Sequence, residues 1–546
     1  MMVGSLSLMK AMPFLAGETM ASISDALNNL PSYLNYPSIP DDLTTPFQQR
    51  LAVYGPNSVS IGWNTYQPIE HPCVFFGTSP GKLDRRACST TPSTTYQTSR
   101  TWSQAVILPS LNSSTTYYYQ IDSTNSSVEH FLSPRIPGDK TPFAIDVVID
   151  LGVYGENGFT KGHVSNLVDK KDTIPEIQPE LNHSTIGRLA QTVDEYEIVI
   201  HPGDFAYADD WWVDSRFLPG ANIDNHIENN FYAATEVYQS ILERFYDQLA
   251  PISGRKPYMA SPGNHEASCF PSNTTIPFAY AGKKLAIPFK DFCPQGQMNF
   301  TDFMHRFDRT MPNAYPSFSK NTTAKALAKM ARSAAQPPFW YSFEYGMAHV
   351  VMINTETDFK DAPEGPGGST GLNQGNFGKR NQQLEFLKAD LASVDRSVTP
   401  WVIVAGHRPY YSCGGSAHMC TECQEAFEDI FYTYGVDLGI FGHVHNSQRF
   451  PPMYQGKVDP NNLTDPTAPM YIIAGGAGNI EGLTPVGSVP PENEFNYDDD
   501  WSYATVKLLD EQHLQVDFIK STTGEILDSS TLFKSHKEQF VRQQRA

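Results

Sequence analysis

Five apolar, strand-like segments of the sequence end in side chains that can bind a metal ion. The first two end at Asp150 and Asp204, and Tyr207 follows closely after the second aspartate. The remaining segments end, in chain order, at Asn264 with His265, at His407, and at His443 with His445. A glycine lies near each position and lets the backbone turn sharply there. Because ligands of open α/β sheets bind beyond the carboxyl ends of the strands, we expect these side chains to form one site.

Each of these features alone has an ordinary structural explanation. An aspartate after a strand often caps a turn or helix, a His-x-His pair is often the polar face of a strand, and Gly-Asn-His can form a tight turn. Their joint occurrence at strand ends favours a metal site instead. Oxygen donors mixed with imidazole suit a pair of iron, zinc or manganese ions rather than calcium. Two such ions about 3.5 to 4 Å apart form the clamp used in phosphoryl transfer.

The segments that would position these residues change character along the chain. Residues 1–44 are a leader and lead-in segment without clear periodicity. Residues 45–138 contain short alternating runs, such as SVSIGW and TYYYQI, between turn-forming residues, which predicts a small antiparallel β-sandwich. In residues 139–546, apolar strands alternate with amphipathic helices, for example at 237–249 and 384–394. This alternation predicts an α/β domain whose sheet is covered on both faces.

The overall composition excludes several classes of protein. The 546 residues include 39 Lys and Arg against 59 Asp and Glu, a formal charge of −20, so a nucleic-acid binder with a basic surface is excluded. Hydrophobic residues make up 40% of the chain, which is ample for a packed core and a poor fit to disorder. No window approaches the roughly 20 apolar residues of a membrane-spanning helix, so we expect no membrane span.

The seven cysteines point to an oxidising compartment. Cys73 and Cys88 are 15 residues apart, Cys269 and Cys293 are 24 apart, and a cluster follows at Cys413, Cys420 and Cys423. This spacing suits short-loop disulfides with one thiol left over. A zinc finger at the last two cysteines would lack a second ligand pair at metal spacing.

Two further features bear on the compartment. The first twenty residues resemble a leader, although Lys10 interrupts the apolar stretch. Asn-x-Ser/Thr glycosylation sequons occur at Asn112, Asn125, Asn182, Asn273, Asn299, Asn321 and Asn462. We therefore expect a secreted protein, or one of the vacuole or cell wall.

The ordered motifs resemble those of a known family. They are Asp150-x-Gly152, Gly203-Asp204-x-x-Tyr207, Gly263-Asn264-His265-Glu266, Gly406-His407 and Gly442-His443-x-His445. This set is similar to that of the purple acid phosphatases, within the calcineurin-like metallophosphoesterases. The stretches YADDWW, PGNHEASC and TPWVIVAGHRPYYS are particularly similar to fungal members. The resemblance runs from about Pro46 to the end of the chain. It implies a β-sandwich metallophosphoesterase domain with flanking helices, preceded by an all-β fibronectin-III-like domain.

The resemblance also implies roles for single residues. Fe(III) would be held by Asp150, Asp204, Tyr207 and His445, and one divalent ion of zinc, iron or manganese by Asp204, Asn264, His407 and His443. The phenolate of Tyr207 bound to ferric iron would give a purple colour. The substrate would contact Asn264, His265 and His418, and His265 and His418 would be the catalytic residues. The sequence departs from the family pattern at Ile149, before the first aspartate, and at Asn446-Ser447-Gln448, after the last histidine.

The function implied is an acid phosphatase. A metal-bound hydroxide at the Fe(III)–M(II) centre would attack a phosphomonoester in line, without a phosphoenzyme, and a histidine would protonate the leaving group. Another dinuclear phosphoesterase, such as a phosphodiesterase, nucleotidase or phytase, would share most ligands but usually lacks Tyr207. An extracellular binding protein with a dead hydrolase domain is the alternative from a different class, and the complete ligand set argues against it.

Overall fold

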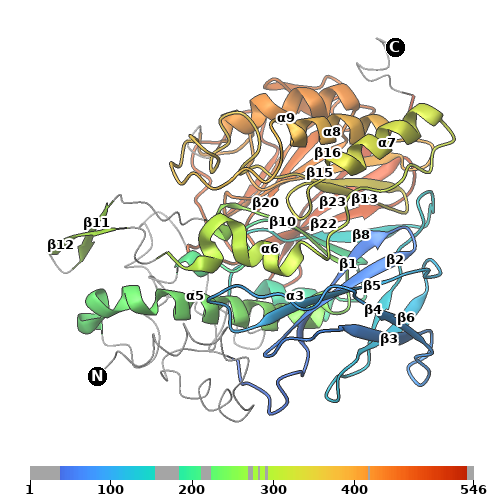
Figure 1. Ribbon diagram of the computed structural model, residues 1–546. Helices are drawn as coiled ribbons and strands as arrows, with labels where there is room; N and C mark the ends of the chain where they lie inside the picture. The colour runs from blue at the N-terminus through green and yellow to red at the C-terminus, as the bar shows by residue number, and fades with distance from the viewer. Residues whose placement is uncertain are drawn as a thin grey trace.

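The computed structural model describes residues 37–153, 184–210, 223–267, 275–280, 283–288, 293–415 and 419–537. The N-terminal strands form a β-rich module beside a larger α/β part (Figure 1). In the module, β1 (Phe47–Gly55), β2 (Ser58–Thr65) and β5 (Trp102–Leu108) form one sheet. The second sheet has the order β4 (Arg85–Cys88), β3 (Cys73–Gly77), β6 (Thr116–Ile121), β7 (Glu129–Leu132). Both sheets are antiparallel and share a buried core, which confirms the predicted all-β sandwich.

A six-stranded sheet begins the larger part. Its order is β10 (Tyr258–Ser261), β9 (Ile198–Pro202), β8 (Phe143–Val147), β22 (Ser502–Leu508), β23 (His513–Lys520), β24 (Ile526–Phe533). The first three strands run parallel to one another, whereas β22, β23 and β24 pair antiparallel. The carboxyl ends of β8, β9 and β10 therefore meet at one edge.

A seven-stranded sheet completes the larger part. Its order is β13 (Tyr341–Tyr345), β14 (Ala348–Met352), β15 (Trp401–Ala405), β16 (Leu438–Phe441), β20 (Met470–Ala474), β17 (Ser447–Phe450), β21 (Phe495–Tyr497). The four strands from β14 to β20 are parallel. Two-stranded ribbons lie outside both sheets, β11 (Thr275–Tyr280) with β12 (Lys283–Pro288) and β18 (Met453–Tyr454) with β19 (Lys457–Val458).

The two large sheets share one hydrophobic core, and helices cover their outer sides. A single cluster of buried side chains includes residues of both sheets. In Figure 1, α7 (Thr322–Ala334), α8 (Gln382–Ser393) and α9 (Thr421–Tyr434) lie on the side of the seven-stranded sheet, and α3 (Ser184–Gln191) and α5 (Ile223–Ser253) lie on the opposite side. The sandwich implied by the family resemblance is confirmed.

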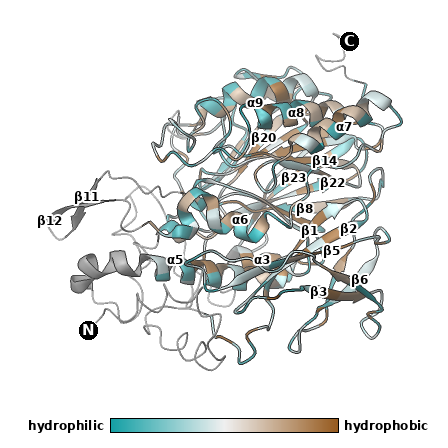
Figure 2. Ribbon diagram, viewed as in Figure 1, coloured by the Kyte–Doolittle hydropathy of each residue, from teal (hydrophilic) through white to brown (hydrophobic). Residues whose placement is uncertain are grey.

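The predicted strands and helices occur, but the strands divide between two sheets instead of forming one. A strand with a sheet on one face and a helix on the other is apolar on both faces, as is a strand between two helix layers. The alternating pattern could not distinguish these arrangements. Figure 2 colours by hydropathy and shows strands rich in hydrophobic residues under helices of mixed polarity.

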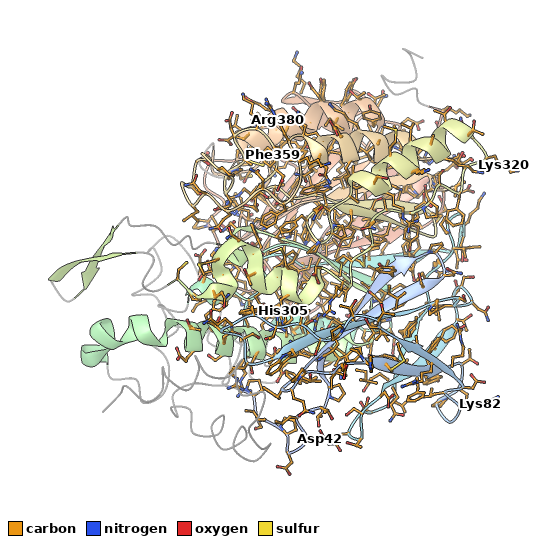
Figure 3. All side chains as sticks on the ribbon, viewed as in Figure 1. Asp42, Lys82, His305, Lys320, Phe359 and Arg380 are labelled. Carbon is orange, nitrogen blue, oxygen red and sulfur yellow. A yellow bond between two sulfur atoms is a disulfide. The ribbon has the colours of Figure 1, made fainter. Side chains whose placement is uncertain are left out.

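A buried ion pair, a hydrogen bond and a ring contact join the N-terminal module to the larger part. Arg100 lies 3.0 Å from Glu243 of α5, and both side chains are only 1% exposed. Arg50 donates to the backbone oxygen of Arg306 in α6 (Thr301–Phe307). His305 of the same helix, labelled in Figure 3, stacks edge-on against Tyr96 of the module. Buried polar and aromatic contacts thus hold the module against the larger part.

The cysteines follow the predicted pattern where the structure describes them. Cys73 is bonded to Cys88 and Cys420 to Cys423, while Cys413 is a buried free thiol. Cys293 also takes part in a disulfide, and Cys269 lies outside the described residues. Of the helices that the structure describes, none has the length and apolar character needed to cross a membrane.

Candidate metal centre

The predicted ligands come together where the carboxyl ends of strands from both large sheets meet. Asp150 follows β8, Asp204 and Tyr207 follow β9, and Asn264 opens the 3₁₀ turn η4 (Asn264–Glu266) after β10. From the other sheet, His407 follows β15, and His443 and His445 follow β16. His418, the second histidine expected at the substrate, lies outside the described residues.

One group of donor atoms surrounds the phenol oxygen of Tyr207. This Oη lies 3.0 Å from Asp150 Oδ1, 3.4 Å from Asp204 Oδ2 and 2.9 Å from His445 Nε2. The far side of the His445 ring is fixed, because Nδ1 lies 3.1 Å from the backbone oxygen of Gly482. These are the four residues that the resemblance assigns to Fe(III).

A second group surrounds His407 Nε2. This nitrogen lies 3.0 Å from Asp204 Oδ2 and 3.1 Å from Asn264 Oδ1. Asp204, His407 and His443 each offer a ligand atom within 4.8 Å of the others, a geometry that could hold a metal ion. Asp204 Oδ2 thus belongs to both groups, as a bridging ligand would.

The chemistry of the two groups fits two cations. Burial and the nearby Asp204 hold the pKa of Asp150 well above its usual range, and burial and Asp150 do the same for Tyr207. Burial also opposes ionisation of Asp204, but His407 and His265 outweigh it and hold the pKa of Asp204 well below its usual range. A cation between Asp150 and Tyr207 would remove the cost of ionising them.

The backbone is strained where the ligands leave their strands. Asp150, Asp204, Tyr207 and His443 all have positive φ, between 53° and 65°. Non-glycine residues rarely adopt this region, and each such position costs on the order of 1–3 kcal/mol. Gly442 is needed for a different reason, since a Cβ there would lie 2.2 Å from the Ile149 side chain. The sequence predicted sharp turns at the neighbouring glycines, and Gly152 and Gly203 do have positive φ, but the ligands themselves share this conformation.

His265 lies beside the ligands with its ring held by a carboxylate. Its Nδ1 is 2.9 Å from Asp209 Oδ1, and its Nε2 is 3.9 Å from both Asp204 and Glu481. Burial lowers the pKa of His265, but the charges of Asp209 and Asp204 outweigh it and raise this pKa well above its usual range. Its side chain keeps 11% exposure, so the ring can meet a ligand at the mouth of the site.

Sequence reasoning missed several residues around these ligands. Arg408 Nη1 lies 3.0 Å from His443 Nε2, and Glu356 and Glu364 hold the same guanidinium. Glu481 lies 3.9 Å from His445 Nδ1 and is 40% exposed. Arg408 directly follows the ligand His407, and this adjacency was the one available signal. The partners of Arg408 and the approach of Glu481 come from loops distant in sequence.

The two departures from the family pattern face the core. Ile149 is fully buried beneath Gly442. Asn446 donates from Nδ2 to the backbone oxygen of Thr484, and Gln448 Oε1 accepts the Cys413 N–H. The side chains at both positions therefore pack loops of the core against one another.

Comparison with known proteins identifies the family. The profile of the calcineurin-like phosphoesterases matches residues 165–447, which ends just after His445. The purple acid phosphatase N-terminal domain matches residues 46–133, and the iron/zinc purple acid phosphatase-like C-terminal domain matches 468–529. "Acid phosphatase A" of Cryphonectria parasitica is 56% identical over 539 residues, which cover 98% of this chain and 99% of that protein.

The chain belongs to the purple acid phosphatases. As a member of this family it is an enzyme, a hydrolase of phosphoric monoesters. "Acid phosphatase" of Aspergillus ficuum is 29% identical over 512 residues, 79% of this chain and 75% of that protein. Among solved structures, purple acid phosphatase PPD1 from yellow lupin seeds shares the fold, with a TM-score of 0.61 at 20% identity over 90% of this chain and 75% of that one.

Proposed function

We propose that this purple acid phosphatase hydrolyses phosphomonoesters at a dinuclear centre of Fe(III) and one divalent ion of zinc, iron or manganese. The observation that carries the proposal is the convergence of two donor groups on one oxygen, Asp204 Oδ2. Asp150, Tyr207 and His445 would complete the ferric half-site, and Asn264, His407 and His443 the divalent one. When bound, the ions would acidify a water molecule into a nucleophile and neutralise phosphate charge.

The residues of the chain would bind the ester and supply the proton. We assign to His265 the protonation of the leaving oxygen, since Asp209 holds its Nδ1 and leaves Nε2 facing the site. A positioned acid of this kind typically contributes 10² to 10⁴-fold. Asn264 and His265 would also contact the phosphate, and we keep His418 as a second substrate histidine.

The proposal also covers the domain organisation of the chain and the cellular compartment of the protein. We propose a lead-in segment at 1–44, a fibronectin-III-like domain at 45–138 and a catalytic domain at 139–546. Two disulfides and five exposed sequon asparagines, at Asn112, Asn125, Asn299, Asn321 and Asn462, support secretion or delivery to the vacuole or cell wall.

Metal-dependent turnover tests the proposed activity. Purified protein should release phosphate from a simple monoester such as p-nitrophenyl phosphate at acid pH, and much less from bis(p-nitrophenyl) phosphate. Chelation should abolish the rate, and iron with zinc should restore it. A preference for the diester would favour the phosphodiesterase alternative. Folded, metal-loaded protein without hydrolysis of either ester would favour the binding protein.

A further inference from the structure

Two ligand loops touch through their backbones in the divalent half-site. The loop after β9 carries Asp204 and the loop after β10 carries Asn264. A Cβ on Gly203 would lie 2.5 Å from the Gly263 nitrogen, and a Cβ on Gly263 would lie 2.3 Å from Asp204 Oδ1. Side chains at these glycines would force the loops apart, so the distance between the two ligands depends on this contact.

One half-buried carboxylate ties the two loops together. Glu266 Oε2 accepts the N–H of Asp204 at 2.9 Å and the N–H of Gly263 at 2.7 Å. Its Oε1 accepts the N–H of Phe205 at 2.9 Å. Both oxygens are therefore acceptors, and three backbone donors from two loops end on a single side chain.

We propose that Glu266 is a positioning residue that sets the spacing of Asp204 and Asn264 and thereby the affinity of the divalent half-site. Its bonds fix the peptide groups at Asp204 and next to Asn264, and within the described part of the chain they do not reach Asp150, Tyr207 or His445. Asp204 belongs to both proposed half-sites, whereas Asn264 belongs to the divalent one alone, so loss of Glu266 should weaken the divalent half-site more than the ferric one. The inference rests on the proposed dinuclear centre.

The neighbouring contacts give the role a physical basis. Asp204 Oδ1 accepts the backbone N–H of His265 at 2.8 Å, a further bond across the same two loops. Once its peptide N–H and this carboxylate oxygen are engaged, Asp204 is oriented with Oδ2 toward His407. Partners that orient ligands in this way typically change metal affinity by 10–100-fold.

An isosteric substitution separates this role from simple filling of space. In Glu266→Gln the side-chain volume is kept, but the amide nitrogen can only donate and must face at least one of the three N–H groups. Glu266→Asp keeps two acceptor oxygens on a shorter side chain. A positioning role predicts damage in the glutamine variant and partial recovery in the aspartate variant, whereas a packing role predicts the reverse order.

Glu428→Gln supplies a matched control. Glu428 is buried and, like Glu266, accepts three hydrogen bonds, from Tyr411, Gln424 and the Gln455 N–H. These partners lie outside the ligand set. Its glutamine variant should lose stability without losing metal, and thus reports the general cost of replacing a buried glutamate.

The test is titration of Zn²⁺ into iron-loaded protein, with iron content measured in parallel. We expect Glu266→Gln to weaken Zn²⁺ binding 10–100-fold with iron retained, Glu266→Asp to fall between it and the wild type, and Glu428→Gln to match the wild type. Wild-type affinity in Glu266→Gln, or an equal loss in Glu428→Gln, would overturn the inference. If Glu266→Gln does not fold, unchanged affinity in Glu266→Asp would overturn it. Wild-type protein that binds no divalent ion would overturn the dinuclear centre itself.

Discussion

The two large sheets bring different kinds of donor atom to the candidate metal centre. The donors that follow strands of the six-stranded sheet all offer oxygen: Asp150, Asp204, Tyr207 and Asn264. Those that follow strands of the seven-stranded sheet all offer imidazole nitrogen: His407, His443 and His445. Each proposed half-site takes donors from both sheets, so neither sheet could hold a metal pair alone.

This difference places the ionisable oxygen donors on one side of the site and the imidazoles on the other. The carboxylates and the phenol lie on one side, where burial raises the pKa of Asp150 and Tyr207. On the other side, burial and the charge of Arg408 hold the pKa of His443 well below its usual range, which keeps the ring neutral and able to bind metal. A high-valent ion should therefore favour the oxygen-rich group around Tyr207, with three oxygens and one nitrogen, and a divalent ion the group around His407, with two of each.

Asp204→Asn should have the largest effect, because this residue is the oxygen donor common to both groups. An amide cannot supply the bridging charge, so we expect loss of activity and a lower content of both metals. Metal analysis of the purified variant beside phosphate-release assays checks this. Two bound metals with a near-normal rate would remove Asp204 from the bridging position.

His407→Ala takes one nitrogen donor from the opposite sheet and should affect one half-site. His407 contacts Asp204 and Asn264, whereas the phenol of Tyr207 contacts His445. We expect loss of the divalent ion and a fall of roughly 10³-fold or more in kcat, because charge stabilisation by one ion is worth several kcal/mol. Iron and colour should remain. Equal loss of both metals would show that the half-sites are not separable in this way.

His265 belongs to neither group of metal donors, so His265→Ala should leave both metals bound. The backbone N–H that His265 donates to Asp204 persists in alanine. We expect kcat to fall by roughly 10² to 10⁴-fold, the range for a lost proton donor. Metal content measured with kcat decides the role, and a parallel fall in both would make His265 a ligand.

The smallest effect should come from a buried acid of the six-stranded sheet away from the site. Burial raises the pKa of Asp146 on β8 from 3.8 to about 7, against a hydrogen bond from Thr505 that lowers it. The folded protein favours the neutral form of Asp146. Its contribution to stability is therefore full below about pH 4 and is lost as pH rises toward 7, because the unfolded chain ionises first. Asp146→Asn should raise Tm relative to the wild type near neutral pH and change little near pH 4, without altering activity.

Asp517→Asn, in the same sheet, is the matched control, because the pKa of Asp517 is shifted in the opposite direction. Burial alone would raise the pKa of Asp517, but hydrogen bonds from Lys507 and Ser529 outweigh it and lower this pKa. Its contribution to stability is present above about pH 4 and is lost in acid. The variant should lower Tm near neutral pH and less so in acid. Thermal unfolding in which both variants changed Tm equally at all pH values would contradict these assignments.

The sequence could predict which side chains converge, because residue type and position at strand ends are local properties, while their role as metal ligands stays a prediction. Asp150, Asp204, His407 and His443 each follow an apolar run by a few residues, so type and position were visible together. The all-β module was visible for the same reason, through alternation within short runs.

The sequence could not predict features that depend on contacts between distant loops. Glu266 looked like the end of a motif, but two of its three bonds reach the loop of Asp204, about sixty residues earlier. The division of strands between two sheets was hidden because both layers bury apolar faces. Arg408 and Glu481 were missed because single charged residues have no periodicity to reveal them.

The central claim is that the oxygen-rich group, with Tyr207 at its centre, holds ferric iron. The most direct measurement is the visible spectrum of the purified protein with its metal content, wild type beside Tyr207→Phe. We predict one iron and one divalent ion per chain, a visible absorption band in the wild type, and loss of this band in Tyr207→Phe with the Asp and His ligands still able to hold metal. A colourless, iron-free but fully active wild type, or a band unchanged in Tyr207→Phe, would contradict the account.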